Sequence, residues 1–148
     1  IRLEVIGQPQ RLPDDVRAII EQVRNATATN DGLLLNLALS YGGRTEIIEM
    51  VRAIAAKAAA GTLQPEAIDE ALVADHLYTR HIPDPDLMIR TSGEMRISNF
   101  LLWQLAYAEL FVTPTLWPDF SPEEFIAILK DYQQRERRFG KVPTQPES

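Results

Sequence analysis

The run LLLNLAL at residues 33–39 is apolar at every position except Asn36. A strand with one face in water alternates apolar and polar residues, whereas a parallel strand covered on both faces reads as a continuous apolar run. Residues 33–39 therefore predict a central strand of a parallel sheet with a layer of structure on each face. Few folds other than helices packed around such a sheet can bury this segment.

The rest of the chain alternates between strand and helix patterns. Strands are expected at residues 1–6, 33–39 and 86–89, and helices from Pro13 past Val23, at 45–60, at 65–77, at 100–107 and from Pro122 to about Arg137 with Ser121 as its N-cap. This order predicts an α/β fold with a mostly parallel central sheet flanked by helices. One domain is expected over residues 1–140, and a disordered tail over 141–148. Since the sequence begins inside a strand pattern, we expect a fragment that lacks preceding strands and helices.

Composition narrows the functional classes. The 148 residues carry a formal net charge of −6, which argues against nucleic-acid binding, so any bound anion needs a local basic site. The chain has no cysteine, which excludes disulfides and thiolate metal sites. No apolar run approaches the roughly 20 residues that span a bilayer, and no signal peptide is evident, so a cytoplasmic location is expected.

The loop between residues 86–89 and 100–107 carries two arginines, Arg90 and Arg96, and the hydroxyl of Ser98. A loop that joins a parallel strand to a helix N-terminus is a common anion site, because the unpaired N–H groups of the first helical turn point into it. Guanidinium groups add paired donors that suit phosphate oxygens. The loop therefore predicts binding of a phosphate or diphosphate. The alternative is a structural turn in which Glu94 pairs with the arginines.

Several longer stretches carry a resemblance to a known family. They are LNLALSYGGR at 35–44, DLMIRTSGE at 86–94, RISNFLLWQ at 96–104, AYAEL at 106–110, LWPDF at 116–120 and RRFG at 137–140. In this order they resemble the cis-prenyltransferases, which include the isoprenyl transferases, over nearly the whole chain from Arg2 to Gly140. The resemblance implies condensation of isopentenyl diphosphate onto an allylic diphosphate, with a cis double bond in the polyprenyl diphosphate product. It also implies Mg²⁺ as cofactor, a homodimer and peripheral membrane association through the lipid product.

The resemblance also implies roles for particular residues. The residues expected to bind substrate diphosphate are Arg90, Arg96, Ile97, Ser98, Arg138 and Gly140, and Glu109 is the expected Mg²⁺ ligand. Read from the residues alone, Ser98 could instead cap the following helix, Glu109 could be a solvated or ion-paired carboxylate, and Arg138 could belong to a charged helix end. The apolar segment 100–107 is expected to be a buried helix that contributes to the homodimer contact.

The family's opening motif, His-x-x-Met-Asp-Gly-Asn-x-Arg-Trp, does not occur in this sequence. In the family this motif supplies the aspartate that assists diphosphate departure with Mg²⁺. The resemblance thus implies that the chain holds no catalytic residue of its own, and that alone it is inactive. Two other functions stay open: a non-catalytic partner subunit of a cis-prenyltransferase, and a generic phosphate-binding α/β domain. Retention of Arg90, Arg96 and Ser98 favours the enzyme over the partner subunit.

Overall fold

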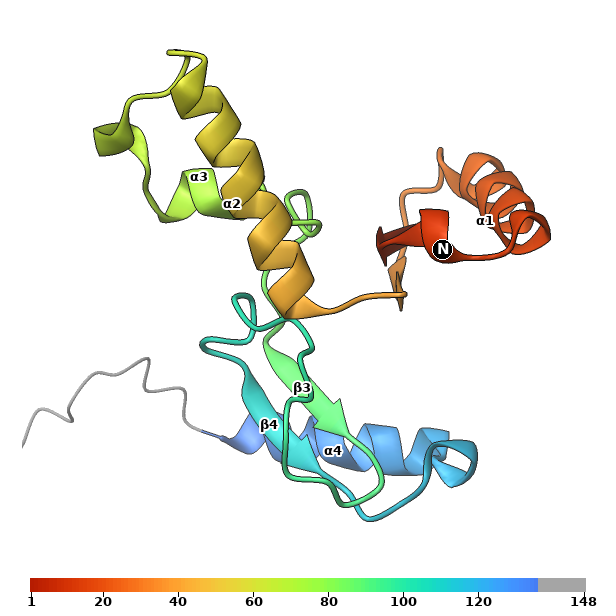
Figure 1. Ribbon diagram of the computed structural model, residues 1–148. Helices are drawn as coiled ribbons and strands as arrows, with labels where there is room; N and C mark the ends of the chain where they lie inside the picture. Colours follow the sequence, from red (N-terminus) through yellow and green to blue (C-terminus); the bar gives the residue numbers. More distant parts are fainter. Residues whose placement is uncertain (136–148) are drawn as a thin grey trace, which may run out of the picture. The chain divides into compact units, whose positions relative to one another are not determined.

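The structure is a computed structural model that describes residues 1–135 of the chain. Its helices and strands follow the order β1 (Arg2–Gly7), α1 (Asp14–Thr27), β2 (Leu34–Leu39), α2 (Gly43–Ala59), α3 (Glu70–Asp75), β3 (Leu87–Arg90), β4 (Glu109–Val112) and α4 (Pro122–Gln134) (Figure 1). Two compact units divide the chain. The first comprises residues 1–83 and 98–102, and the described part of the second comprises 84–97 and 103–135. The α/β class is confirmed, whereas the extent of a single domain stays a prediction and the tail at 141–148 lies outside the described residues.

In the first unit, β1 and β2 pair in parallel, from Arg2 opposite Leu34 to Gly7 opposite Leu39. Helix α1 packs beside β1, where the Leu3 N–H donates a 3.1 Å hydrogen bond to Thr27 Oγ1 near the end of the helix. The expectation that residues 33–39 are covered on both faces is wrong for the described residues, since Leu35 and Leu37 are 45% and 38% exposed. The two-stranded sheet thus leaves one row of β2 side chains without a covering layer.

The core of the first unit lies between α2 and the segment around α3. Met50 and Ile54 of α2 pack with Leu77, which is almost fully buried. The helix expected at 65–77 is wrong as one element, because Ile68 is extended and interrupts it. The chain restarts as α3, which is capped by the Asp69 carboxylate through a 2.8 Å hydrogen bond from the Leu72 N–H. A local capping interaction therefore breaks a segment whose composition suits a continuous helix.

A buried carboxylate holds the turn between β2 and α2. Glu46, only 2% exposed, accepts hydrogen bonds from the Tyr41 hydroxyl and, at 2.7 Å, from the Tyr78 N–H. The Tyr78 hydroxyl donates to Glu49, which also accepts a 2.9 Å hydrogen bond from the Gln8 amide. Burial, followed by hydrogen bonding to a carboxylate, raises the pKa of both tyrosines far above the ordinary range.

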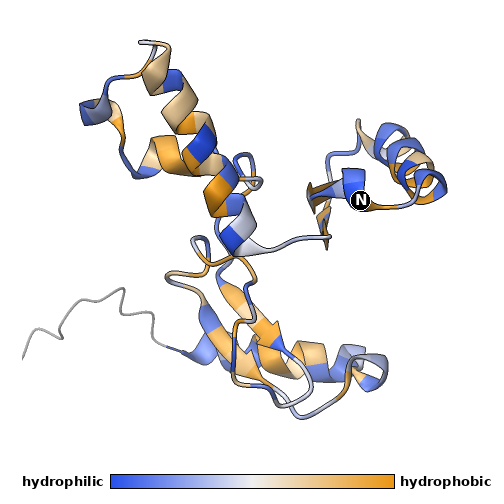
Figure 2. Cartoon of the chain, viewed as in Figure 1, coloured by the Kyte–Doolittle hydropathy of each residue, from blue (hydrophilic) through white to orange (hydrophobic). Residues whose placement is uncertain are grey.

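The second unit is built on β3 and β4, which pair in parallel from Leu87 opposite Glu109 to Arg90 opposite Val112. Most residues of these two strands are hydrophobic (Figure 2). Helix α4 begins with the predicted cap, in which Ser121 Oγ accepts a 3.2 Å hydrogen bond from the Glu124 N–H. The Glu124 side chain also accepts a 3.1 Å hydrogen bond from Thr115 Oγ1 and another from Thr113, so the helix is tied to the segment after β4.

The buried helix expected at 100–107 is absent, and the expectation was wrong. Residues 101–107 form bends and turns, closed by hydrogen bonds such as that from the Ala106 N–H to the Trp103 carbonyl at 3.3 Å. Trp103 and Tyr107 are 38% and 77% exposed, so the segment is not buried throughout. One of the three points at which the chain passes between the two units lies between Leu102 and Trp103. Strand β4, which follows these turns, was not expected from the sequence.

No helix within residues 1–135 combines the length and hydrophobicity that crossing a bilayer requires.

Candidate diphosphate site

Two arginines of the second unit converge on one carboxylate. Arg90 lies at the carboxyl end of β3, and Glu94 and Arg96 lie in the loop that follows. One oxygen of Glu94 accepts a hydrogen bond from Arg90, and the other accepts one from Arg96. The alternative in which Glu94 pairs with the arginines is therefore confirmed. The same geometry shows that both guanidinium groups can reach a single anion with two or more oxygens.

These side chains line a cavity of about 480 Å³. Arg90, Glu94, Arg96 and Ile97 lie on it, together with the apolar residues Met88, Met95, Leu110, Phe111 and Val112. The cavity thus combines two cationic groups with an apolar wall. A ligand with an anionic head and a hydrocarbon body matches that combination better than a free inorganic ion.

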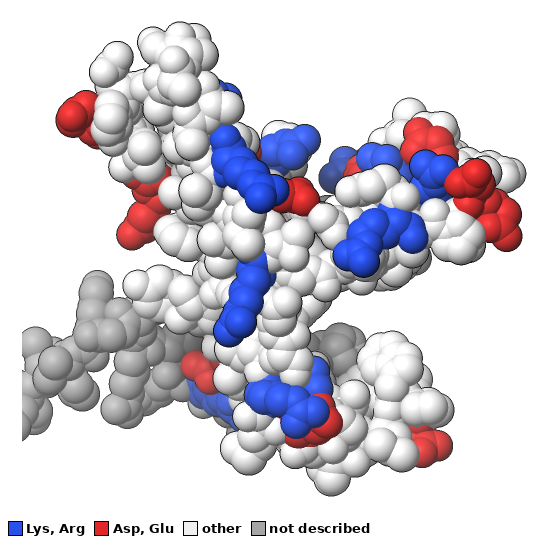
Figure 3. Space-filling model, in the orientation of Figure 1, with Lys and Arg blue, Asp and Glu red and all other residues white. Residues whose placement is uncertain are grey.

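The charges around Glu94 favour its ionised form. The hydrogen bond from Arg90 is the main cause that holds the pKa of this carboxyl below its usual range, and the charges of both arginines act in the same direction. Basic and acidic side chains adjoin on the face of the second unit seen in Figure 3. With one carboxylate between two guanidinium groups, the cluster keeps a net charge of +1 and can still attract an anion.

The segment after β4 also binds the backbone of the loop that carries Glu94 and Arg96. The Ser92 N–H donates to the Thr115 carbonyl and the Gly93 N–H donates to the Thr113 carbonyl, each at 2.8 Å. Both loop residues adopt the left-handed conformation, with φ of 68° and 69°. These two amide groups are therefore engaged within the fold. Because the expected helix at 100–107 is absent as well, the loop offers an anion side-chain donors and no helix N-terminus.

The other residues expected in the site are distributed differently. Ser98 belongs to the first unit, and since residues 101–107 form turns, the interpretation of Ser98 as the cap of a following helix is wrong. Arg138 and Gly140 lie outside the described residues. In the second unit the structure thus brings together Arg90, Arg96 and Ile97, and adds Glu94.

Glu109 lies apart from the two arginines. It pairs with Leu87 at the start of the β3–β4 ladder, whereas Arg90 is three residues further along, about 10 Å in a parallel strand pair. Its carboxylate accepts a 3.3 Å hydrogen bond from Arg135, whose guanidinium also binds Asp131 at 2.8 Å and lies 5.6 Å from the centre of the Phe111 ring. The ion-paired alternative for Glu109 is thus confirmed. Arg135 had no signal in the sequence beyond a basic residue near a helix end.

Within residues 1–135, no group of three or more His, Asp or Glu side chains is placed to hold a metal ion. Glu109 supplies one carboxylate, which is the kind of ligand that Mg²⁺ takes together with water and phosphate oxygens. Among the described residues, Glu109 is thus the one expected Mg²⁺ ligand, and in this structure it is ion-paired with Arg135.

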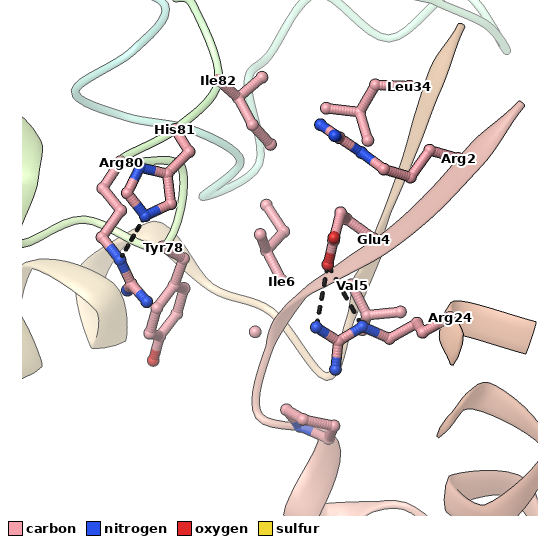
Figure 4. A pocket seen from close by; sticks show the side chains of 12 residues that line it. Arg2, Glu4, Val5, Ile6, Arg24, Leu34, Tyr78, Arg80, His81 and Ile82 are labelled. Carbon is pink, nitrogen blue, oxygen red and sulfur yellow. Dashed lines mark hydrogen bonds and ion pairs between the residues drawn. The ribbon is translucent and has the colours of Figure 1, made fainter. Parts of the chain in front are cut away.

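A second cavity, of about 540 Å³, lies in the first unit beside β1 (Figure 4). Arg24 on its wall binds Glu4 with a 3.0 Å ion pair, and Arg80 donates a 3.3 Å hydrogen bond to the neighbouring His81 ring. None of the residues expected to bind diphosphate lines this cavity. The resemblance assigns diphosphate contacts only to residues away from this cavity, so the cavity at Arg90 and Arg96 stays the candidate for an anionic ligand.

Comparisons with known proteins agree with the motifs. Residues 1–140 match a protein-family model described as "Putative undecaprenyl diphosphate synthase". The chain is 53% identical to an isoprenyl transferase of Heliobacterium mobile, with 96% of this chain and 55% of the relative covered. An isoprenyl transferase of Porphyromonas gingivalis is 54% identical, with 98% and 57% covered.

Solved structures show the same relationship. The crystal structure of lavandulyl diphosphate synthase from Lavandula x intermedia, in complex with dimethylallyl diphosphate, matches with a TM-score of 0.92 and 42% identity, covering 95% of this chain and 60% of that one. A structure described as a probable undecaprenyl diphosphate synthase from Campylobacter jejuni matches with a TM-score of 0.80 and 41% identity, covering 95% and 63%. The chain thus spans less than two thirds of the length of these relatives. On the family model and these identities, the chain belongs to the undecaprenyl diphosphate synthase family of cis-prenyltransferases.

Proposed function

We propose that this chain provides the isopentenyl diphosphate site of a cis-prenyltransferase, which condenses isopentenyl diphosphate onto an allylic diphosphate with cis geometry. The observation that carries the proposal is the convergence of Arg90 and Arg96 on the two oxygens of Glu94. A diphosphate presents the same kind of acceptor pair to the two guanidinium groups. Family membership supplies the reaction class, and the convergent arginines supply its anion-binding part.

Different side chains of the cavity bind the diphosphate and the hydrocarbon part of the ligand. Arg90 and Arg96 bind diphosphate oxygens, with Ile97 beside them on the wall and Ser98 as a hydroxyl donor. The hydrocarbon part lies against Met88 and the other apolar residues of the wall. Arg138 and Gly140, outside the described residues, complete the diphosphate contacts in this proposal. Fixing the ligand at both ends holds its reacting carbon in place, and such positioning supplies a large part of the rate in a two-substrate reaction.

Mg²⁺ is the proposed cofactor, with Glu109 as the protein ligand. When bound, the ion would neutralise charge on the diphosphate oxygens. Because Glu109 is paired with Arg135, the carboxylate must exchange a guanidinium for the ion. Arg135 keeps its ion pair with Asp131 in that exchange, so the arginine is not left unpaired.

We further propose that the protein is a cytoplasmic homodimer that meets membranes only through its lipid product. The exposed side chains of Trp103 and Tyr107 support a subunit contact, because large aromatic residues are enriched in interfaces. Analytical ultracentrifugation tests the dimer, and cell fractionation tests the location. A sedimentation profile that stays monomeric across a hundredfold range of concentration would contradict the dimer.

Calorimetric titration of isopentenyl diphosphate into the chain, with Mg²⁺, tests the site. Arg96→Ala should weaken the affinity at least about tenfold, since a charge-assisted hydrogen bond contributes on the order of 1.5–3 kcal/mol. Arg17→Ala is the matched control, because Arg17 is a partly exposed arginine that pairs with Asp14 on α1. The Arg17→Ala variant should bind isopentenyl diphosphate with the affinity of the unsubstituted chain.

Competing ligands separate the alternatives. Equal affinity for inorganic phosphate, pyrophosphate and isopentenyl diphosphate would indicate a generic phosphate-binding domain. Absence of saturable binding by a folded chain would contradict the proposed site. A condensation assay with radiolabelled isopentenyl diphosphate and an allylic diphosphate tests the remaining expectation, that the chain alone does not turn over.

A further inference from the structure

A segment of the first unit caps a helix that lies far away in the sequence. The Asn99 carbonyl accepts a 2.7 Å hydrogen bond from the Gly43 N–H, and Asn99 Oδ1 accepts a 2.8 Å hydrogen bond from the Arg44 N–H. Both donors belong to the first turn of α2, whose N-cap residue, Gly42, has no side chain to offer. Asn99 therefore caps α2, a role that a Ser, Thr, Asn or Asp side chain at the N-cap position fills in an ordinary helix.

The two glycines before α2 are fitted to this contact. A Cβ atom on Gly42 would lie 2.8 Å from Asn99 Nδ2, and one on Gly43 would lie 2.9 Å from Leu102 Cγ and 3.2 Å from the Leu102 nitrogen. Beside them, the rings of Tyr41 and Phe100 meet edge to face with their centres 5.7 Å apart. The turn after β2 is thus shaped to receive residues 98–102, and a side chain at either glycine would displace them.

The contact also determines the backbone conformation next to Ser98. Ser98 and Asn99 both adopt left-handed conformations, with φ of 52° and 63°. Asparagine tolerates this region, whereas serine reaches it at a cost that the surrounding structure must offset. The two hydrogen bonds from α2 hold Asn99, the residue that immediately follows Ser98, through its carbonyl and its side-chain oxygen. They thus restrain the chain directly next to Ser98.

We propose that Asn99 is a positioning residue of the diphosphate site, which acts by capping α2 and thereby holding Ser98 in the conformation that binds the ligand. The proposal rests on the proposed function, since it needs Ser98 as a diphosphate ligand. In this proposal Asn99 acts through Ser98, while its two oxygen acceptors bind α2. The turn at Gly42 and Gly43 supports residues 98–102 of the same unit.

Three substitutions at position 99, measured in the chain of 148 residues, test the proposal by calorimetric titration of isopentenyl diphosphate. Asn99→Ala removes the side-chain acceptor and disfavours the left-handed backbone, and we expect about tenfold weaker affinity. Asn99→Gly keeps the backbone freedom but lacks the acceptor, so it should remain weak. Asn99→Asp keeps the acceptor and tolerates the backbone, so its affinity should stay within about threefold of that of the unsubstituted chain.

Two further measurements separate positioning from general destabilisation. Ser121→Ala removes a cap of the same kind from α4, and it should lower the melting temperature without changing the affinity. In a Ser98→Ala background, Asn99→Ala should change the affinity less than about twofold, because its effect passes through Ser98.

Unchanged affinity of Asn99→Ala, or a full tenfold loss in the Ser98→Ala background, would overturn the proposal. If Arg96→Ala also leaves the affinity for isopentenyl diphosphate unchanged, the proposed function itself fails. If Arg96→Ala weakens the affinity and Asn99→Ala does not, only the inference about Asn99 is refuted.

Discussion

The carboxylate of Glu94 accepts a hydrogen bond from the guanidinium of Arg90, four residues before it in the chain. With its second oxygen on Arg96, Glu94 occupies the place where the two arginines would meet a bound diphosphate. A ligand must therefore displace this carboxylate. We expect Glu94→Gln to bind pyrophosphate about fivefold more tightly than the unsubstituted chain does, because the local charge rises from +1 to +2. Titration at fixed ionic strength measures the difference.

Glu123→Gln provides the control for this prediction. Glu123 is an exposed carboxylate in the first turn of α4, and its substitution changes the net charge of the chain by the same amount. Its pyrophosphate affinity should not change. Weaker binding by Glu94→Gln would show that the carboxylate holds the arginines together instead of competing with the ligand.

The ion pairs of Glu94 also predict a pH dependence of stability. Its pKa is lowered from an ordinary value of 4.5, so folding favours the ionised carboxyl. The stabilisation is fully present above the ordinary pKa and is lost as the pH falls through the lowered pKa of the folded state. The difference in unfolding free energy between the unsubstituted chain and Glu94→Gln should be constant above about pH 5.5 and shrink below about pH 4. Urea titrations at several pH values measure it, and a difference that grows on acidification would contradict the assignment.

Tyr41 and Tyr78 should ionise only at high pH. Burial and hydrogen bonds to Glu46 and Glu49 raise the pKa of both hydroxyls above an ordinary value of 10.0. Folding favours the protonated hydroxyls, so their stabilisation is present below about pH 10 and is lost as the pH rises further. Absorbance at about 295 nm should show a late component of the titration that coincides with unfolding. Tyr41→Phe and Tyr78→Phe should each reduce that component, and an unchanged profile in both would refute the prediction.

Gly43 has no room for a side chain. Because a Cβ atom would meet Leu102 at 2.9 Å and the Asn99 carbonyl at 3.3 Å, Gly43→Ala should push residues 98–102 away from α2. We expect a loss of about 1–3 kcal/mol of unfolding free energy, as in other cases of overpacking. Gly32→Ala is the matched control, since the nearest atom to its Cβ would be 3.9 Å away. Equal stability of the two variants would show that Leu102 and Asn99 do not lie close to Gly43.

Leu77 is the most buried residue of the α2–α3 core. Leu77→Ala leaves a cavity against Met50 and Ile54, and we expect a loss of about 2–5 kcal/mol. Leu116→Ala removes the same atoms from a side chain that is 58% exposed, and it should change stability by less than about 0.5 kcal/mol. Chemical denaturation measures both, and a small effect at Leu77 would show that this core repacks.

The elements that the sequence predicted well are those with local signals. The apolar run at 33–39 became β2, the acidic first turn after Pro13 opened α1, and Ser121 caps α4 as expected. Each of these signals lies within a few residues of the element that it predicts, so no knowledge of the rest of the fold was needed.

Apart from the break at Ile68, which goes with the local cap at Asp69, the failures depend on contacts that are distant in the sequence. Residues 100–107 have a helical composition, yet Asn99 is held by α2, and the chain passes from one unit to the other at Leu102. Strand β4 has only four residues and is defined by its pairing with β3. In the site, the two arginines were predicted from the motif, and their pairing with Glu94 was an open alternative. The interaction of Glu109 with Arg135 could not be foreseen, because it joins β4 to the end of α4.

Residues 98–102 belong to the first unit, although the stretches on both sides of them belong to the second. The polypeptide therefore crosses between the units three times, and no single cleavage can release one of them intact. A gene truncated after Pro83 would encode every strand and helix of the first unit but would leave α2 without its cap.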